Sequence, residues 1–135
     1  MATNGDFISS SLRLLGVLME TESASAEQGA TGLVALNDLM ADLSASDIDL
    51  GYAPQSDPTA NCPISIEYRQ SVKYLLAVLL APIYTRPVGP VVAAFAEAGK
   101  NKLLRDAINR NLTPVRTDLP RSEARRYGYN ILTDT

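Results

Sequence analysis

Apolar residues recur every three or four positions in four separate stretches of this chain, which is the spacing of one face of an α-helix. The first stretch covers about residues 6–19, the second 26–43 and the third 65–81. The fourth begins at residues 88–90 and ends near residue 111. We therefore predict an all-α fold, a bundle of about four helices that occupies residues 1–111.

The same spacing selects the side chains that should face the core. The chain has no Trp, and only 6% of its residues are aromatic, so the core must be built mainly from Leu, Val, Ile and Ala. The expected inward positions are Phe7, Ile8, Leu12, Leu15, Leu18, Ala26, Ala30, Leu33, Leu36, Met40, Leu43, Val72, Leu75, Leu76, Leu79, Val92, Phe95, Ala96, Gly99, Leu103 and Ala107.

Helix boundaries are marked by capping and proline signals. Ser25 followed three residues later by Gln28 is a capping-box pattern, and it predicts the start of the second helix. Glu27 would then lie in the first turn, where the helix dipole favours negative charge. Pro82 should end or kink the third helix, because proline lacks a backbone donor.

A long polar segment separates the second and third helices. Residues 44–63 are rich in Ser, Asp and Pro and show no helical period. Such a segment exceeds the roughly 12–15 residues beyond which structureless loops are uncommon in compact domains, and long ordered loops often bind a partner. The piece "DIDLGY" at residues 47–52 is a candidate strand. Asp47, Asp49 and Tyr52 are the residues of this loop that we expect to contact a partner.

Several observations indicate an intracellular site of assembly. The single cysteine, Cys62, excludes an intrachain disulfide and favours a reducing compartment. The first ten residues lack the basic start and apolar run of a signal peptide. The longest apolar run, "YLLAVLLAPIY", is shorter than the ~20 residues of a membrane-spanning helix. We expect the cytoplasm of the cell that makes the protein, and no membrane partner.

Charge is distributed unevenly along the chain. Residues 1–60 contain nine acidic residues and one basic residue, whereas residues 61–135 contain six acidic and eleven basic residues. The formal net charge is −3. This asymmetry indicates two surfaces with different partners, although charge runs are also common on solvated faces.

The sequence offers little for catalysis. Histidine is absent, which removes the usual general base and the commonest metal ligand, and we expect neither a cofactor nor a metal. The strongest candidate pair is Glu20 and Glu22 in "ETESASAEQG", because glycoside hydrolysis uses two carboxyl groups about 5–9.5 Å apart. They lie in a Ser-rich turn with no apolar wall to shift their pKa values. We interpret this stretch as a helix corner, and the protein as a non-enzyme.

A small DNA-associated or regulatory helical protein is the alternative. The last third is rich in Lys and Arg, and two tyrosines could stack on bases. The pI of 4.8, however, is the reverse of the basic footprint of DNA-binding domains.

The end of the chain has a different composition. Residues 112–135 lack a helical period and cannot build a core alone, so we predict an extended C-terminal arm that folds onto a partner. Arg and Tyr carry much of the energy of binding interfaces. The arm residues expected to bind are Arg116, Arg121, Arg125, Arg126, Tyr127 and Tyr129.

Two stretches resemble a known viral family. They are "GVLMETESASAEQGATGLVALNDLMADLSA" at residues 16–45 and "YLLAVLLAPIY" at residues 74–84. The order of segments is similar to that of the head-to-tail adaptors, or connectors, of tailed bacteriophages. Within that family it resembles the tail accessory factors of short-tailed phages, also called packaged-DNA stabilization proteins.

The matching motifs are short. The family pattern contains a Leu-Asn pair, here Leu36 and Asn37, in its second long helix. It also contains Leu-Ala-x-x-Leu-Ala-Pro-x-Tyr, which is matched by Leu76, Ala77, Leu80, Ala81, Pro82 and Tyr84. The family usually has Gly after that tyrosine, and this chain has Thr85.

The resemblance implies a structural virion protein at the head-tail junction. Family members form a ring, commonly a dodecamer, beneath the portal protein. They extend the DNA channel, help to retain the packaged genome and support the tail or nozzle protein. Their C-terminal arms reach the portal, which agrees with the Arg- and Tyr-rich segment. Genomic DNA would pass through the lumen without sequence-specific binding.

An acidic lumen would let DNA slide, because each Lys or Arg contact to a phosphate adds affinity. We therefore hypothesise that the channel-facing candidates are Glu20, Glu22, Asp38 and Asp42. Small residues, among them Gly29, Gly32 and "AAFAEAG" at residues 93–99, permit close helix approach either within the domain or between subunits.

Overall fold

The computed structural model describes residues 2–112, and it is all-helical as predicted. The elements are α1 (Asn4–Leu14), α2 (Ala26–Ala45), α3 (Ile66–Leu80) and α4 (Pro90–Asn111). Within the described residues there is no strand, so the strand prediction for residues 47–52 was wrong. An isolated bridge pairs Thr3 with Asn61.

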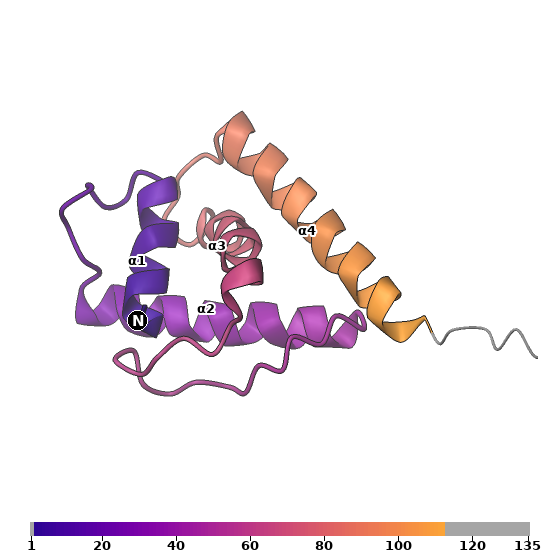
Figure 1. Ribbon diagram of the computed structural model, residues 1–135. Coiled ribbons are helices and arrows are strands. Elements are labelled where there is room, and N and C mark those ends of the chain that lie inside the picture. Colours follow the sequence, from indigo (N-terminus) through magenta and orange to yellow (C-terminus); the bar gives the residue numbers. More distant parts are fainter. Residues whose placement is uncertain (1, 113–135) are drawn as a thin grey trace, which may run out of the picture.

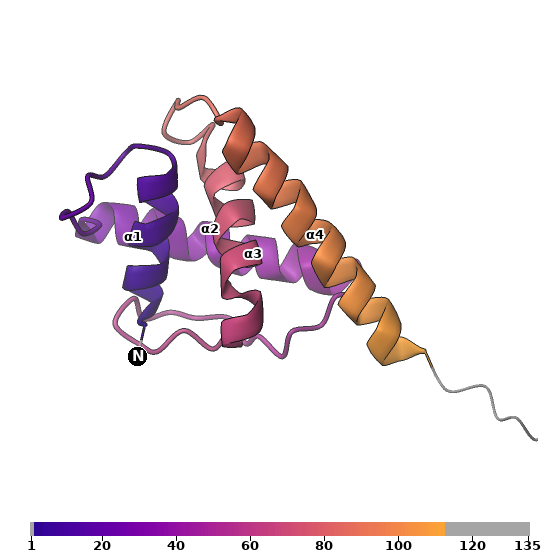
Figure 2. The same ribbon diagram turned by 45° about the horizontal axis from the view of Figure 1, so that its top comes forward.

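Helix α3 occupies the centre of the domain and contacts each of the other three helices. In Figure 1 it is seen nearly end-on, with α1 and α2 to its left and below and α4 crossing on the right. Figure 2 shows α4 packed along α3, away from α1. The fully buried side chains at the centre of this arrangement include Phe7, Ile8, Leu12, Leu36, Val72, Leu76, Leu80 and Leu103.

Helices α1 and α2 begin at capping boxes, and α4 begins at a proline. Ser25 and Gln28 form the predicted capping box at the start of α2, with bonds of 3.0 and 3.2 Å. Thr3 and Asp6 form a second box at the start of α1, and hydrogen bonds from Thr3 lower the pKa of Asp6. Pro90 is the first residue of α4, where its missing N–H costs no helical bond.

The first three helices end in the same hydrogen-bonded motif. At each end, a carbonyl accepts from the N–H of the residue five positions later, and the residue before that donor has a positive φ. The accepting carbonyl belongs to the last turn of α1 and of α2, and to the residue that follows α3. The donor–acceptor pairs are Val17 to Leu12, Ile48 to Leu43 and Arg86 to Ala81, at 3.1, 2.9 and 3.0 Å. Gly16, Asp47 and Thr85 occupy the positive-φ positions.

Gly16 explains why α1 is shorter than predicted. The apolar period continues to Leu18, but Gly16 adopts φ +72° and ends the helix after Leu14. Leu15 and Leu18 are nevertheless buried, because the chain folds back over the core after the turn. Periodicity alone therefore identified the buried residues here but not the helix end.

Four of the predicted inward side chains are exposed. Ala26 and Ala30 lie on the outer side of α2, because the buried side is formed by Gly29, Leu33 and Leu36. Leu79 and Phe95 are 39% and 50% exposed, and Leu75 is only partly buried. A four-helix domain of this size covers only part of each helix, so apolar residues at the margins of the stripes remain in contact with solvent.

Two glycines serve packing within the domain. A Cβ at Gly32 would clash with the side chain of Ile8 on α1, and one at Gly99 would lie 2.9 Å from Cβ of Ser71 on α3. Gly29 has no such neighbour within 4 Å. The close approaches at residues 32 and 99 are therefore α1–α2 and α3–α4 contacts.

Thr85 is the strained member of the three helix ends, since a β-branched residue at φ +51° brings Cβ close to the backbone. We expect Thr85→Gly to raise the free energy of unfolding by about 1 kcal/mol in urea denaturation. Thr85→Ala is the control, because it keeps the Cβ and should gain much less. Equal effects of the two changes would contradict this explanation.

Candidate functional site

The long loop between α2 and α3 is held by the side chain of Asn37. The Asn37 amide donates to the backbone carbonyl of Gln55 at 2.8 Å. Its Oδ1 accepts from the Tyr52 hydroxyl at 2.6 Å and from the Gln55 N–H at 3.0 Å. One polar side chain of α2 therefore satisfies three groups of the loop, which explains the Asn of the Leu-Asn pair, while Leu36 is fully buried in the core.

Tyr52 belongs to this internal contact. Burial raises the pKa of Tyr52 to about 12, and the neighbouring Cys62 adds to the shift. Its hydroxyl is bonded to Asn37, so Tyr52 holds the loop against α2 rather than presenting a free hydroxyl to another protein.

The other end of the loop is held by the N-terminal segment. The N–H groups of Asn4 and Gly5 donate to the carbonyls of Ala60 and Pro58 at 2.9 and 2.8 Å. The N–H of Cys62 donates to the carbonyl of Ala2 at 3.1 Å, and the buried Asn4 amide donates to the carbonyl of Asp57 at 3.0 Å. The loop is thus ordered by contacts within its own domain.

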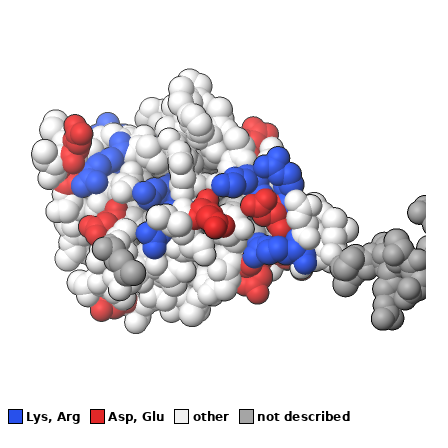
Figure 3. Space-filling model, in the orientation of Figure 1, with Lys and Arg blue, Asp and Glu red and all other residues white. Residues whose placement is uncertain are grey.

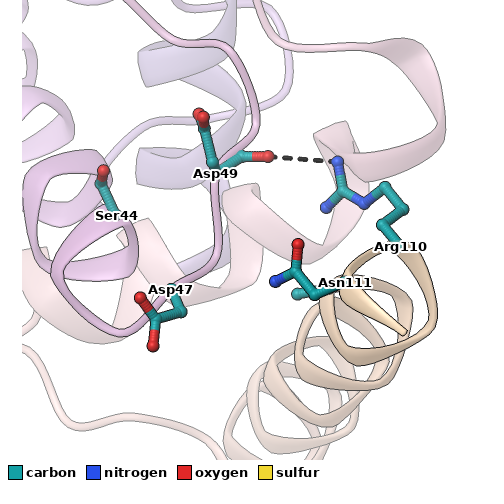
Figure 4. A pocket seen from close by; sticks show the side chains of 6 residues that line it. Ser44, Asp47, Asp49, Arg110 and Asn111 are labelled. Atoms are coloured by element: carbon teal, nitrogen blue, oxygen red, sulfur yellow. Dashed lines mark hydrogen bonds between the residues drawn. The ribbon is translucent and has the colours of Figure 1, made fainter. Parts of the chain in front are cut away.

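A hollow of about 470 Å³ lies between the end of α2, the start of the loop and the last turn of α4. Figure 4 shows Asp47 and Asp49 on one side of it and Arg110 and Asn111 on the other. Arg110 Nη1 donates to the backbone carbonyl of Asp49 at 3.1 Å. Two of the three predicted loop residues therefore line this hollow, at the end of the described helical domain.

Arg110 was not selected from the sequence as a site residue, yet it joins three segments. Besides its bond to the loop, its guanidinium lies 5.8 Å from the ring centroid of Tyr68 on α3. The last turn of α4 is thereby fixed to both the loop and α3. With two carboxylates opposite one guanidinium, the hollow suits a polar or charged peptide segment better than an apolar ligand.

Glu20 and Glu22 are exposed in the turn between α1 and α2. Glu22 Oε2 accepts from the N–H of Met19 at 3.3 Å, and its backbone carbonyl accepts from Arg13. These bonds stabilise the turn. Within residues 2–112, both carboxyl groups are exposed to solvent.

Asp38 and Asp42 are exposed on α2, beside an apolar groove. The groove has a volume of about 370 Å³ and lies between α2 and the end of α3. Its lining residues are Thr31, Val34, Ala35, Asp38, Leu79 and Ile83. Val34 lies outside the predicted inward stripe of α2, but Leu79 was predicted to face inward, so the groove could not be recognised from the sequence.

The predicted arm residues Arg116, Arg121, Arg125, Arg126, Tyr127 and Tyr129 lie outside the described residues. The proposed boundary at residue 111 therefore stays a prediction. Among residues 2–112, no group of three or more metal-ligating side chains is present, and no helix is long and apolar enough to cross a membrane.

The model of one protein family, described as P22 tail accessory factor, matches residues 1–133 of the chain. The chain belongs to this family. The match includes both the helical domain and nearly all of the Arg- and Tyr-rich segment, so the resemblance seen in the sequence is confirmed at the level of a phage tail and neck family. Membership indicates a structural component of the virion.

A curated relative comes from Acyrthosiphon pisum secondary endosymbiont phage 1 and is described as "Peptidoglycan hydrolase gp27". It is 28% identical over 132 residues, which are 93% of this chain and 82% of that protein. The similarity therefore extends over almost the whole chain.

The second motif of the family has a structural explanation in this fold. Leu76, Ala77, Leu80 and Ala81 are all buried on one side of α3. Tyr84 is partly buried, and burial raises its pKa. The family's usual Gly after this tyrosine corresponds to Thr85, whose φ is positive, as the helix end requires.

The burial of Tyr52 makes stability pH-dependent. Since the pKa of Tyr52 rises from 10.0 to about 12 on folding, the folded chain keeps this proton while the unfolded chain loses it. The stabilisation is complete below pH 10 and disappears as the pH rises through about 12. We expect Tyr52→Phe to be less stable by about 1 kcal/mol near pH 7.

The difference in unfolding free energy between wild type and Tyr52→Phe should shrink from pH 9.5 to 11.5. Tyr74→Phe is the matched control, because Tyr74 stacks on Phe95 through its ring, with centroids 5.2 Å apart. A gap between wild type and Tyr52→Phe that stays constant over this pH range would contradict the assignment.

Proposed function

We propose that this protein is a head-to-tail adaptor that forms a ring beneath the portal at the head-tail junction of a short-tailed phage. The ring, a dodecamer by analogy with the family, would extend the DNA channel, retain the packaged genome and carry the tail. The observation that carries the proposal is the family match over residues 1–133, which includes the region of the predicted arm.

We assign a partner to each group of predicted binding residues. The C-terminal arm, with Arg116, Arg121, Arg125, Arg126, Tyr127 and Tyr129, is assigned to the portal protein. Asp47 and Asp49, which line the hollow at the end of α4, are assigned to a tail or nozzle protein or a neighbouring subunit. Tyr52 is assigned to loop order, because its hydroxyl is bonded to Asn37.

The channel-facing role is proposed for Glu20 and Glu22. Both carboxylates are exposed on a turn that is held in place by hydrogen bonds of Glu22 with Met19 and Arg13. A ring of such carboxylates would repel the phosphates of passing DNA, so the genome would slide without being bound. Asp38 and Asp42 share the outer side of α2 with an apolar groove, which favours a contact with another chain over the channel.

The proposal is tested with the portal ring of the same phage. We expect full-length protein to add a second ring to the portal in negative-stain images, and a chain truncated after Leu112 to add none. The truncated chain keeps all four helices, so its circular dichroism and melting temperature should show that the domain is folded. If the full-length chain does not dock, the adaptor function is wrong.

In that event, the DNA-associated alternative predicts a different result. The chain would shift an oligonucleotide, with an affinity that falls steeply as salt increases. An adaptor with an acidic lumen should show no such binding.

Peptidoglycan cleavage is a second candidate function, favoured by the description of the phage relative as a peptidoglycan hydrolase. Its chemistry would require two placed carboxyl groups, one with a raised pKa, and Glu20 and Glu22 are exposed to solvent. We expect the wild-type chain to release no fragments from purified peptidoglycan, and Glu20→Gln and Glu22→Gln to dock on the portal normally. Cleavage by the wild type that is lost in either variant would establish the hydrolase instead.

A further inference from the structure

The outer side of α2 is acidic with an apolar centre. It is defined here as the α2 face and consists of Glu27, Val34, Asp38, Ala41, Asp42 and Ala45, all of which are exposed. Residues 26–45 contain three acidic residues and no basic residue. Val34 is 61% exposed, and the adjoining groove adds Ile83 at 53%.

The outer side of α4 has the opposite charge. It is defined here as the α4 face and consists of Val91, Ala94, Ala98, Lys102, Arg105 and Ile108, all of which are exposed. Residues 90–111 contain four basic and two acidic residues, and all four basic residues lie at or after Lys100. Val91 and Ile108 are 64% and 58% exposed. Figure 3 shows basic side chains on the α4 side of the molecule, interspersed with acidic ones.

The two faces are complementary in three respects. Each has exposed aliphatic side chains, each has alanines that allow close helix approach, and their net charges have opposite signs. Complementary charges steer association and fix register, while the apolar groove supplies area to bury. The α3 contact of α4 is formed mainly through Ala96, Gly99 and Leu103. Lys102 lies at the margin of that contact, where its Nζ donates to the backbone carbonyl of Glu67 at 3.2 Å.

The two faces lie on different sides of the domain and are both exposed, so they do not contact each other within one chain. Figure 1 shows α2 along the lower edge of the domain and α4 along its right edge. A contact between unlike faces of identical chains is heterologous, and it generates a closed ring when its rotation closes. A second copy of this chain therefore offers the groove a partner of matching shape and charge.

We propose that the α2 face of one copy binds the α4 face of the next copy, with the groove at Val34, Leu79 and Ile83 covered by the neighbour's α4. This inference rests on the ring of the proposed function and names the surfaces that join it. It places Asp38 and Asp42 against Lys102 and Arg105 of the neighbouring copy. Glu20 and Glu22 remain for the channel.

The test uses two variants of the full-length chain, each with one altered face. The first is Asp38→Lys with Asp42→Lys, and the second is Lys102→Glu with Arg105→Glu. Each alone should raise the protein concentration needed to complete a ring on the portal at least about tenfold, since like charges then oppose each other at every contact. Mixed in equal amounts, they should assemble to within about threefold of wild type, because every contact then pairs either two normal or two reversed faces.

The control is Arg86→Glu, which reverses an exposed charge outside both faces and should leave ring completion unchanged. Restored assembly in the mixture also excludes misfolding as the reason that either variant fails alone. Self-association of each sample is measured in parallel by sedimentation velocity at high protein concentration without portal.

The outcomes separate this inference from the proposed function. If wild type completes a ring on the portal and both face variants do so equally well, or if the mixture fails, the assigned faces are wrong while the adaptor function stands. If wild type does not bind the portal but self-associates, and self-association is lost in each face variant and restored in their mixture, the assigned faces are right and the adaptor function is wrong. Absence of both docking and self-association in the wild type overturns both.

Discussion

The burial of helix α3 is the constraint on which the rest of the domain depends. Val72, Leu76 and Leu80 are fully buried, and α1, α2 and α4 all pack against this helix. Each such aliphatic side chain stabilises the fold by about 1.5–3 kcal/mol relative to exposure. Where α3 meets α4, Gly99 and Ser71 allow the backbones to approach closely. The core therefore relies on close packing of small and aliphatic residues, as a chain without Trp must.

Around this core, polar groups decide how the irregular segments lie. Asn37 holds the middle of the long loop on α2, and the N-terminal segment holds its second half. Buried backbone groups need partners, and these contacts supply them without a strand. The consequence is an ordered loop whose Asp47 and Asp49 stay beside Arg110, at the end of the domain nearest the predicted arm.

The distribution of exposed residues fits a component of an assembly better than an isolated enzyme. The candidate carboxylates are solvated, whereas aliphatic side chains on the outer sides of α2 and α4 remain uncovered. In the ring that we propose, these faces would join neighbouring copies. The charge asymmetry between the two halves of the chain becomes a difference between two helices on different sides of the domain.

Helical periodicity, capping residues and prolines determined the fold class and the approximate position of every helix, because these signals are local along the chain. They also identified most of the core and recognised the family through short motifs. They could not place the end of α1, the orientation of Leu79 and Phe95, or the role of Tyr52. These depend on which helix lies beside which, and thus on contacts between residues far apart in sequence. Only the tertiary structure brought Asn37 to the loop and Val34 to Ile83, because each pairing depends on how α2 packs against its neighbours.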